Sequence, residues 1–273
     1  MRRLIRFLFT KLINASDIRR VIREEIDTAL IQQLRNIDYG LHFKAIIDSA
    51  NFVHEHIPLH KRFTNKELRS VAVKMAPSDG LVLEFGVYKG GSIRQFAQLT
   101  SRMIYGFDSF EGIPEPWTLR KKGDFSVNAL PDVPSNVVLI KGWFNDTLPV
   151  FLDEHENSVA FVHLDCDLYS SSKMVLEMLA DRMRPGTIIV MDDFLEEPGW
   201  QHEQNKAFFE FVEAHAVKYE YIGYTVSTPS SAVSVVLTAI DNKTSADGNR
   251  HQPLCEDEQS LEQSLEQSQR LIV

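Results

Sequence analysis

Hydrophobic and polar positions follow two different periods along the chain. Across residues 15–56 the apolar residues recur every three or four positions, which is typical of helices with one buried face. Across residues 81–239 short apolar runs rich in β-branched residues alternate with further helical segments. This second pattern is that of βαβ units built on a parallel sheet. The sequence therefore predicts an N-terminal helical extension followed by an α/β domain.

Seven strands and four intervening helices are expected in the second region, and a further helix precedes the first strand. The fold class is thus a Rossmann-like, doubly wound, seven-stranded sheet with helices on both faces. The last two strands are joined by a turn-rich segment, which predicts an antiparallel hairpin at one edge. The expected strands are 81–85, 103–107, 137–140, 159–164, 186–191, 219–224 and 232–239, and the helices are 65–75, 92–99, 145–155, 169–183 and 203–215.

Changes in composition divide the chain into three parts. Residues 1–76 form the helical extension and residues 77–240 the catalytic domain. Residues 241–273 are polar and repetitive and carry seven acids against three basic residues, so we expect a disordered acidic tail. Within the domain, residues 109–133 are too long for a simple connection and predict a functional loop.

Charge and cysteine content limit the function classes. The net charge of −9 argues against a general nucleic-acid-binding protein. Residues 1–23 carry seven Lys or Arg and one acid. We expect this basic, amphipathic segment to form a helix that packs on the domain or on a second subunit. The alternative is that the helix makes weak peripheral contact with an anionic membrane. No segment is apolar for long enough to span a bilayer. The only cysteines, Cys166 and Cys255, provide no disulfide framework, which favours a reducing cytoplasm. The N-terminal helices favour a homo-oligomer.

Four carboxylates follow two of the predicted strands. Asp165 and Asp167 come directly after the apolar run 159–164, and Asp192 and Asp193 end the run 186–191. In an open α/β sheet the carboxyl ends of the strands bind ligands. Because four clustered acids repel one another in a poorly hydrated cleft, we expect raised pKa values or a bound cation. As an alternative, these aspartates cap the helices that follow them. His163, within the strand, is expected to be a hydrogen-bonded core residue.

The first strand-to-helix turn carries the features of a nucleoside-binding loop. Gly86 and Gly90 are separated by three residues, which departs from the dinucleotide-binding pattern GxGxxG. Asp108, which ends the second strand, is placed to bind ribose hydroxyls. Glu84 would repel a pyrophosphate but could hold the ammonium group of an amino acid, so S-adenosylmethionine is favoured over NAD.

Five segments in this order resemble one enzyme family. They are LEFGVYKGGS, GFDSFEGIP, KGWFNDTLP, HLDCDLYSSS and VMDDF, which lie between residues 83 and 194 within a resemblance that extends from about 81 to 237. They look like the TylF/MycF/NovP group of class I, metal-dependent O-methyltransferases, which use S-adenosylmethionine to methylate sugar hydroxyls. The resemblance implies a class I methyltransferase fold, the methyl donor S-adenosylmethionine, and Mg²⁺ or another hard divalent cation.

The resemblance also implies a role for individual residues. Asp165, Asp192 and Asp193 would be the metal ligands, and Asp167 the general base. Gly142 and the residues up to Asn145 would lie beside the adenine. Apart from the resemblance, Trp117, Trp143 and Trp200 are candidates either to line the pocket or to serve simple packing. The implied donor-binding residues are Glu84, Phe85, Gly86, Val87, Tyr88, Gly90, Ser92, Asp108, Ser109 and Gly142.

The chemistry of these residue types agrees with methyl transfer to oxygen. A sugar hydroxyl is too weakly acidic to ionise at neutral pH, and a hard cation can lower its pKa while a carboxylate removes the proton. The expected acceptor is a sugar or another polyhydroxylated small molecule. A metal-dependent glycosyltransferase using the DxD motif and a catalytically silent, methyltransferase-like assembly module are the alternatives.

Overall fold

The computed structural model describes residues 23, 25, 35–226 and 231–241. The predictions for the basic N-terminal helix and the acidic tail lie outside these residues. The strands are β1 (Arg62–Phe63), β2 (Leu81–Phe85), β3 (Ile104–Asp108), β4 (Val137–Lys141), β5 (Val159–Leu164), β6 (Ile188–Leu195), β7 (Lys218–Thr225) and β8 (Ser231–Ala239). The helices are α3 (Ile37–His56), α4 (Asn65–Met75), α5 (Gly91–Leu99), α6 (Phe144–Glu154), α7 (Tyr169–Leu179) and α8 (Gln204–Ala214), with short 3₁₀ turns at Ala180–Arg182 and Trp200–His202.

One sheet contains all the described strands, in the order β1-β7-β8-β6-β5-β2-β3-β4. Only β8 runs antiparallel to its neighbours among these strands. The predicted fold class is confirmed, but the number of strands is eight and not seven. The additional strand, β1, pairs with β7 through two residues, Arg62 and Phe63, and is too short to leave a periodic pattern in the sequence.

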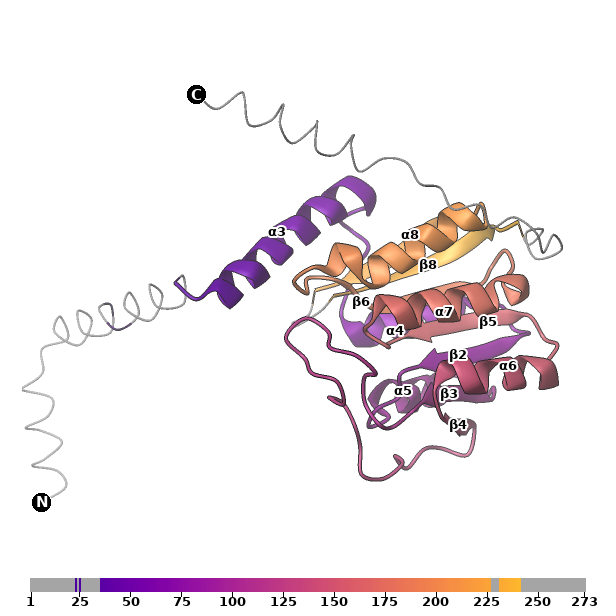
Figure 1. Cartoon of the computed structure of the whole chain (residues 1–273). Coiled ribbons are helices and arrows are strands. Elements are labelled where there is room, and N and C mark those ends of the chain that lie inside the picture. Colours follow the sequence, from indigo (N-terminus) through magenta and orange to yellow (C-terminus); the bar gives the residue numbers. More distant parts are fainter. Residues whose placement is uncertain (1–22, 24, 26–34, 227–230, 242–273) are drawn as a thin grey trace, which may run out of the picture. The chain divides into compact units, whose positions relative to one another are not determined.

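Helices cover both faces of the sheet, as Figure 1 shows. Buried residues of α6, α7 and α8 share one hydrophobic core with α3, and those of α4 and α5 contribute to a second core on the other face. All five residues of β2 and all six of β5 are buried. Strands covered on both faces read as continuous apolar runs, which is why their bounds were predicted correctly from the sequence.

The chain changes direction across the sheet between β2 and β5. From β2 it builds β3 and β4 outwards on one side, and it then returns to place β5 on the other side of β2. The register pairs Phe85 of β2 with Leu164 of β5, and Leu164 with Met191 of β6. Gly86, Asp165 and Asp192 therefore follow at the same level, at the switch point where open α/β sheets bind ligands.

Strand β6 is longer than the sequence predicts. It continues to Leu195, which pairs with Ser231 of β8 after a shift in register. Asp192 and Asp193 therefore lie inside a strand and cap no helix. Likewise the residue that caps α7 is Leu168, not Asp167. The helix-cap alternative is wrong for Asp192 and Asp193 because β6 continues to Leu195, and for Asp167 because α7 begins one residue later, with Leu168 at its N-cap.

Helix α3 packs on the domain through its C-terminal half. The ring of Phe52 lies 5.9 Å from that of Phe194 and 5.5 Å from that of Trp200, measured between centroids. Ser49 Oγ accepts a hydrogen bond from the backbone N–H of Glu196 at 2.9 Å. By contrast, Ile37 and Phe43 near its start are 77% and 66% exposed.

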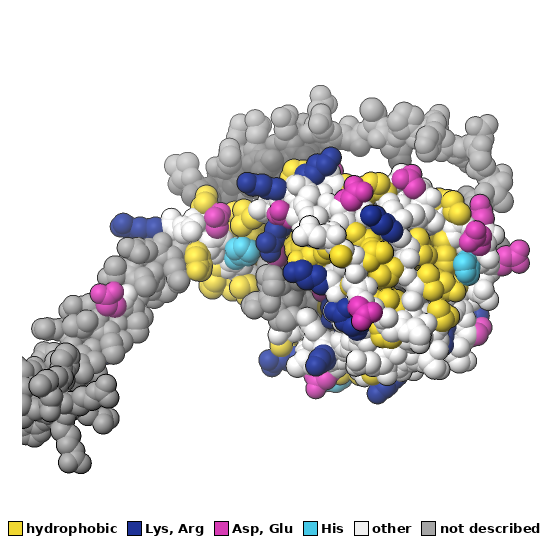
Figure 2. Space-filling model, turned by 90° about the horizontal axis from the view of Figure 1, so that it is seen from below, with side chains coloured by type: hydrophobic (Ala, Val, Ile, Leu, Met, Phe, Trp, Pro, Cys, Tyr) yellow, Lys and Arg dark blue, Asp and Glu magenta, His cyan; other side chains and the backbone are white. Residues whose placement is uncertain are grey.

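The surface mixes apolar and charged side chains. Figure 2 shows one face on which a broad hydrophobic area lies beside Lys and Arg side chains, with acids among them. Among the described helices, none combines the length and hydrophobicity needed to cross a bilayer.

Candidate functional site

A cavity of about 360 Å³ opens at the carboxyl ends of β2, β3 and β5. This volume lies within the range of small-molecule sites. Its wall is formed by the turn after β2, the end of β3, the start of α6, the β5–α7 connection and the loop 109–133. The predicted residues that line it are Gly86, Tyr88, Asp108, Ser109, Trp143, Asn145, Asp165 and Asp167.

The turn after β2 is built so that its backbone touches β5. Gly86 has φ +91°, and a Cβ at this position would overlap the carbonyl oxygen of Asp165. Its N–H donates to the carbonyl of Phe107 at 2.9 Å. Only glycine satisfies both the backbone angle and the close approach.

Asp108 fastens this turn to β3. Its Oδ2 accepts hydrogen bonds from the N–H groups of Val87 at 2.8 Å and Tyr88 at 2.7 Å. Its Oδ1 accepts from the N–H of Phe110 at 2.6 Å. Asp108 lines the cavity, where the sequence predicted a ribose contact. Its hydrogen bonds also stabilise the conformation of the turn.

Three of the four predicted acids come together beside this turn. One oxygen from each of Asp165, Asp167 and Asp193 lies within 4.8 Å of the others. Gln204 of α8 helps to place them, because its side chain accepts from the N–H of Asp193 at 3.2 Å and donates to the carbonyl of Leu164 at 3.3 Å. Oxygen groups at this spacing suit a hard divalent cation.

Two carboxyl groups of this cluster, those of Asp165 and Asp167, have raised pKa values. Burial, together with the charge of Asp192, raises the pKa of Asp165 well above its ordinary value. Burial and the charge of Asp165 raise the pKa of Asp167 to about 7, although a hydrogen bond with Asp193 opposes the shift. Without a cation, the cluster reduces its mutual repulsion by binding protons.

Asp192 has different surroundings. Its Oδ1 lies 2.7 Å from Nη2 of Arg69 and 3.4 Å from Nε2 of His163. Burial would raise the pKa of Asp192, but the hydrogen bond from His163 and the charge of Arg69 outweigh it and lower the pKa. The structure therefore brings together only two of the three predicted metal ligands, Asp165 and Asp193, and adds Asp167 to them.

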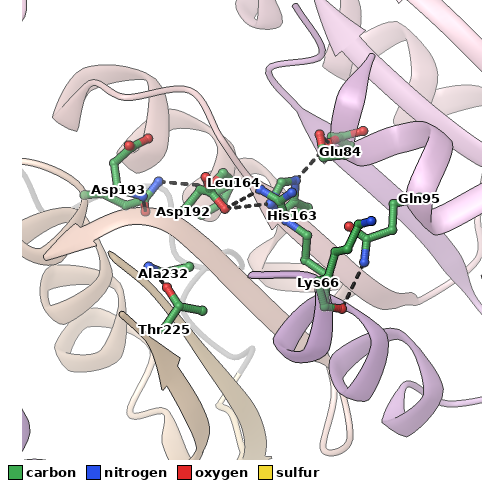
Figure 3. A network of polar contacts seen from close by, with 12 residues as sticks. Lys66, Glu84, Gln95, His163, Leu164, Asp192, Asp193, Thr225 and Ala232 are labelled. Carbon is green, nitrogen blue, oxygen red and sulfur yellow. Dashed lines mark hydrogen bonds and ion pairs between the residues drawn. The ribbon is translucent and has the colours of Figure 1, made fainter. Parts of the chain in front are cut away.

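Glu84 lies behind the cavity and does not line it. Its Oε1 accepts from Ser92 Oγ and lies 2.9 Å from Nδ1 of His163. Burial would lower the pKa of His163, but its hydrogen bonds to Asp192 and Glu84 raise it to about 9. His163 is a hydrogen-bonded core residue, as predicted, and Figure 3 shows it between Glu84 and Asp192.

The comparisons with known proteins agree with this geometry. The family model described as a methyltransferase domain matches residues 83–194. The matched region contains the glycine turn and all four aspartates.

Two curated relatives are similar to this chain. One is 8-demethyl-8-(2,3-dimethoxy-alpha-L-rhamnosyl)-tetracenomycin-C 4'-O-methyltransferase from Streptomyces olivaceus, 33% identical over 162 residues, with 49% of this chain and 60% of the relative covered. The other is mycinamicin III 3''-O-methyltransferase from Micromonospora griseorubida, 25% identical, with 55% and 72% covered. The chain therefore spans less than two thirds of the length of the first relative. Both are O-methyltransferases, so the predicted resemblance is confirmed.

Among solved structures, CalS11, a calicheamicin methyltransferase, has a TM-score of 0.48. It is 23% identical, with 63% of this chain and 76% of that chain covered.

The cavity is also lined by residues that the sequence did not single out. Ile113 and Phe125 from the predicted loop 109–133 line the cavity, as does Met174 of α7. Three residues around the cavity, Tyr88, Phe125 and Asp167, adopt positive φ angles of 50°, 68° and 62°. Backbone strain of this kind collects at functional sites. Helix periodicity around Met174 and the length of the loop were the available signals.

Other predicted residues lie away from the cavity wall. Phe85, Val87, Gly90, Ser92 and Gly142 are not among its lining residues. Trp117 packs in a small cluster with Ile113 and Leu168, and Trp200 packs against Phe52. Of the three tryptophans, only Trp143 is among the lining residues.

Proposed function

We propose that the protein is an S-adenosylmethionine- and Mg²⁺-dependent O-methyltransferase that acts on a hydroxyl of a sugar or another polyhydroxylated small molecule. The observation that supports this most directly is the position of the acid cluster. Asp165 and Asp167 line the same cavity as the glycine turn of the methyltransferase domain, and Asp193 lies beside them. A donor and a cation bound there would be neighbours.

The donor side of the cavity fits a nucleoside. The backbone at Gly86 and Tyr88 borders the cavity, and the side chains of Trp143, Phe144 and Asn145 offer an apolar wall with one amide for a base. In this proposal the donor residues would hold S-adenosylmethionine in the same cavity that Asp165 and Asp167 line, where it would supply the methyl group. Holding the reacting atoms in line supplies much of the rate acceleration.

The acid side fits Mg²⁺ and an acceptor hydroxyl. Asp165 and Asp193 would hold the cation, which when bound lowers the pKa of an acceptor hydroxyl and orients it. Asp167 is the proposed general base, because its carboxylate borders the cavity and its pKa of about 7 lies near neutral pH. The charge of Arg120, from the loop 109–133, acts on Asp167 and stabilises its ionised form.

A sugar-like acceptor is inferred from two observations. The name of the first relative includes a rhamnosyl group. In addition, the cavity combines carboxylates with the aromatic side chain of Phe125, a combination that suits a polyhydroxylated ring. A cytoplasmic location and a homo-oligomeric state stay predictions from the sequence.

Calorimetry on the full chain tests the proposal. We expect S-adenosylhomocysteine to bind in EDTA, and Mg²⁺ to stimulate methyl transfer from S-adenosylmethionine to an acceptor in a panel of rhamnosides and other glycosides. A catalytically silent module would show donor binding without transfer to any member. A protein that binds no S-adenosylhomocysteine would contradict the proposal outright.

A further inference from the structure

Glu197 is a buried carboxylate just beyond the end of β6. The residue is 7% exposed. Its side chain makes no hydrogen bond or ion pair with another residue that the structure describes. A buried polar group without a partner lowers stability, and such groups collect at sites where a ligand supplies the missing partner.

The backbone around Glu197 is held in an unusual conformation. Glu196, the preceding residue, has a positive φ of 75°, which costs free energy in any residue except glycine. Its N–H donates to Ser49 Oγ of α3 at 2.9 Å, and its Oε2 accepts from Ser231 Oγ of β8 at 2.7 Å. The carbonyl of Glu197 accepts from the N–H of Trp200 at 3.0 Å. The burial of Glu197 is therefore fixed by contacts to three other segments.

Arg120 lies at the rim of the cavity, at the end of a tight turn in the loop 109–133. Trp117 and Arg120 exchange two backbone hydrogen bonds, and Trp117 packs with Leu168, the residue directly after Asp167. The guanidinium carbon of Arg120 lies 5.3 Å from the ring centroid of Phe125, which lines the cavity. The loop thus presents a cation where the cavity opens.

Arg120 connects Glu197 with the cavity. Its charge lowers the pKa of both Asp167 and Glu197. His42 of α3 is the other group whose charge acts on Glu197 in this way, whereas burial raises the pKa of that carboxyl. Glu197 therefore lies between α3 and the loop, and Arg120 is near it and near the proposed base.

We propose that Glu197 and Arg120 form an acceptor subsite next to the cavity, where they bind two neighbouring, uncharged hydroxyl groups other than the one that is methylated. This inference rests on the proposed function and specifies its acceptor. A hydroxyl can donate to a carboxylate and accept from a guanidinium. An ammonium group would be repelled by Arg120, and an anionic group would be repelled by Glu197 and Asp167.

Acceptor kinetics of the full chain test the subsite. The probe is the glycoside of the panel with the highest kcat/KM, used with Mg²⁺ and saturating S-adenosylmethionine. We expect Glu197→Gln to raise the acceptor KM about 10-fold or more and to change kcat less than about threefold, because a charge-assisted hydrogen bond to the acceptor is lost. One monodeoxy analogue of the probe, which lacks the hydroxyl bound by Glu197, should show similar KM values with both proteins.

The matched control is Glu213→Gln, which makes the same change at an exposed residue of α8. Its KM should stay within about twofold of wild type. A KM for Glu197→Gln that is equally close to wild type would overturn the subsite.

Thermal unfolding in EDTA distinguishes an acceptor subsite from a structural role. Because Glu197→Gln removes a buried charge that no described hydrogen bond stabilises, its Tm should equal or exceed that of wild type. Binding of S-adenosylhomocysteine, by calorimetry, and of Mn²⁺, by electron paramagnetic resonance, should stay within about twofold. A fall in Tm of more than about 4 °C would show that the fold needs this carboxylate and would overturn the inference.

Failure of the subsite and failure of the proposed function give different results. Wild-type methyl transfer with an unchanged KM in Glu197→Gln would overturn the subsite alone. A wild-type protein that binds no S-adenosylhomocysteine and methylates no member of the panel would contradict the proposed function, and the subsite with it.

Discussion

The two halves of the cavity are built on different principles. In the donor half, the turn after β2 already has its backbone N–H groups bonded to Asp108 and Phe107, and Gly86 touches β5 without room for a side chain. In the acid half, Asp165 and Asp167 have raised pKa values because they are buried and lie close to other carboxylates. The donor half is shaped by backbone hydrogen bonds that are already formed. In the acid half, by contrast, a bound cation would reduce the repulsion among the carboxylates.

Gly86→Ala should cause the largest loss of stability and of donor binding, because it distorts the turn that forms the donor half. The added Cβ would overlap the carbonyl of Asp165, and the φ of +91° is unfavourable for alanine. We expect little folded protein, or a fall in Tm of more than about 10 °C with loss of S-adenosylhomocysteine binding. Gly91→Ala, where an added Cβ meets nothing within 4 Å, is the matched control. Equal behaviour of the two variants would show that the close approach to β5 is not needed.

Asp167→Asn should abolish most of the methyl transfer that depends on the acid half and leave donor binding unchanged. The amide keeps the size of the side chain but cannot take a proton, so we expect methyl transfer to fall by roughly 10²–10⁴-fold. Binding of S-adenosylhomocysteine should stay within about twofold of wild type, since the turn at Gly86 is untouched. Steady-state kinetics and calorimetry measure the two quantities. Activity within a few fold of wild type would remove Asp167 from the role of base.

The difference between the halves also explains what the sequence could predict. Strands β2 and β5 and the glycine turn leave local signals, namely continuous apolar runs and a glycine motif. Arg69 and Gln204 leave none, because each is an ordinary polar residue on an amphipathic helix and acquires its role only by packing against β6. The extension of β6 to Leu195 likewise depends on pairing with β8, which the local sequence does not encode.

The same point applies to the paired acids. The sequence predicted correctly that aspartates of two adjacent strands would meet. It could not tell which of Asp192 and Asp193 would lie next to Asp165 and Asp167, because the motif places them side by side. That choice depends on the pleat of β6 and on the cation that α4 supplies to one of them.

The pH dependence of stability in EDTA should sharpen the comparison. Aspartates whose pKa is higher in the folded than in the unfolded protein stabilise the fold below about pH 4, and that stability is lost as the pH rises through about 7, the pKa of Asp167. We therefore expect Tm to fall by roughly 5 °C or more between pH 5 and pH 8. Asp167→Asn should flatten the profile, and Mg²⁺ should raise Tm most at the alkaline end. A rise of Tm over this interval in EDTA would contradict the raised pKa values.

Thr64→Ala should give the smallest effect, because it acts on the acid half only through the start of α4. Thr64 and Glu67 form a reciprocal cap, in which Thr64 Oγ1 accepts from the N–H of Glu67 at 3.3 Å and Glu67 Oε2 accepts from the N–H of Thr64 at 2.9 Å. Loss of this cap costs about 1 kcal/mol, or about 2–4 °C in Tm. Because the cap is a turn away from Arg69, Mn²⁺ and donor affinities should stay unchanged while Tm falls. A loss of Mn²⁺ affinity in this variant would mean that the start of α4 controls the position of the acids.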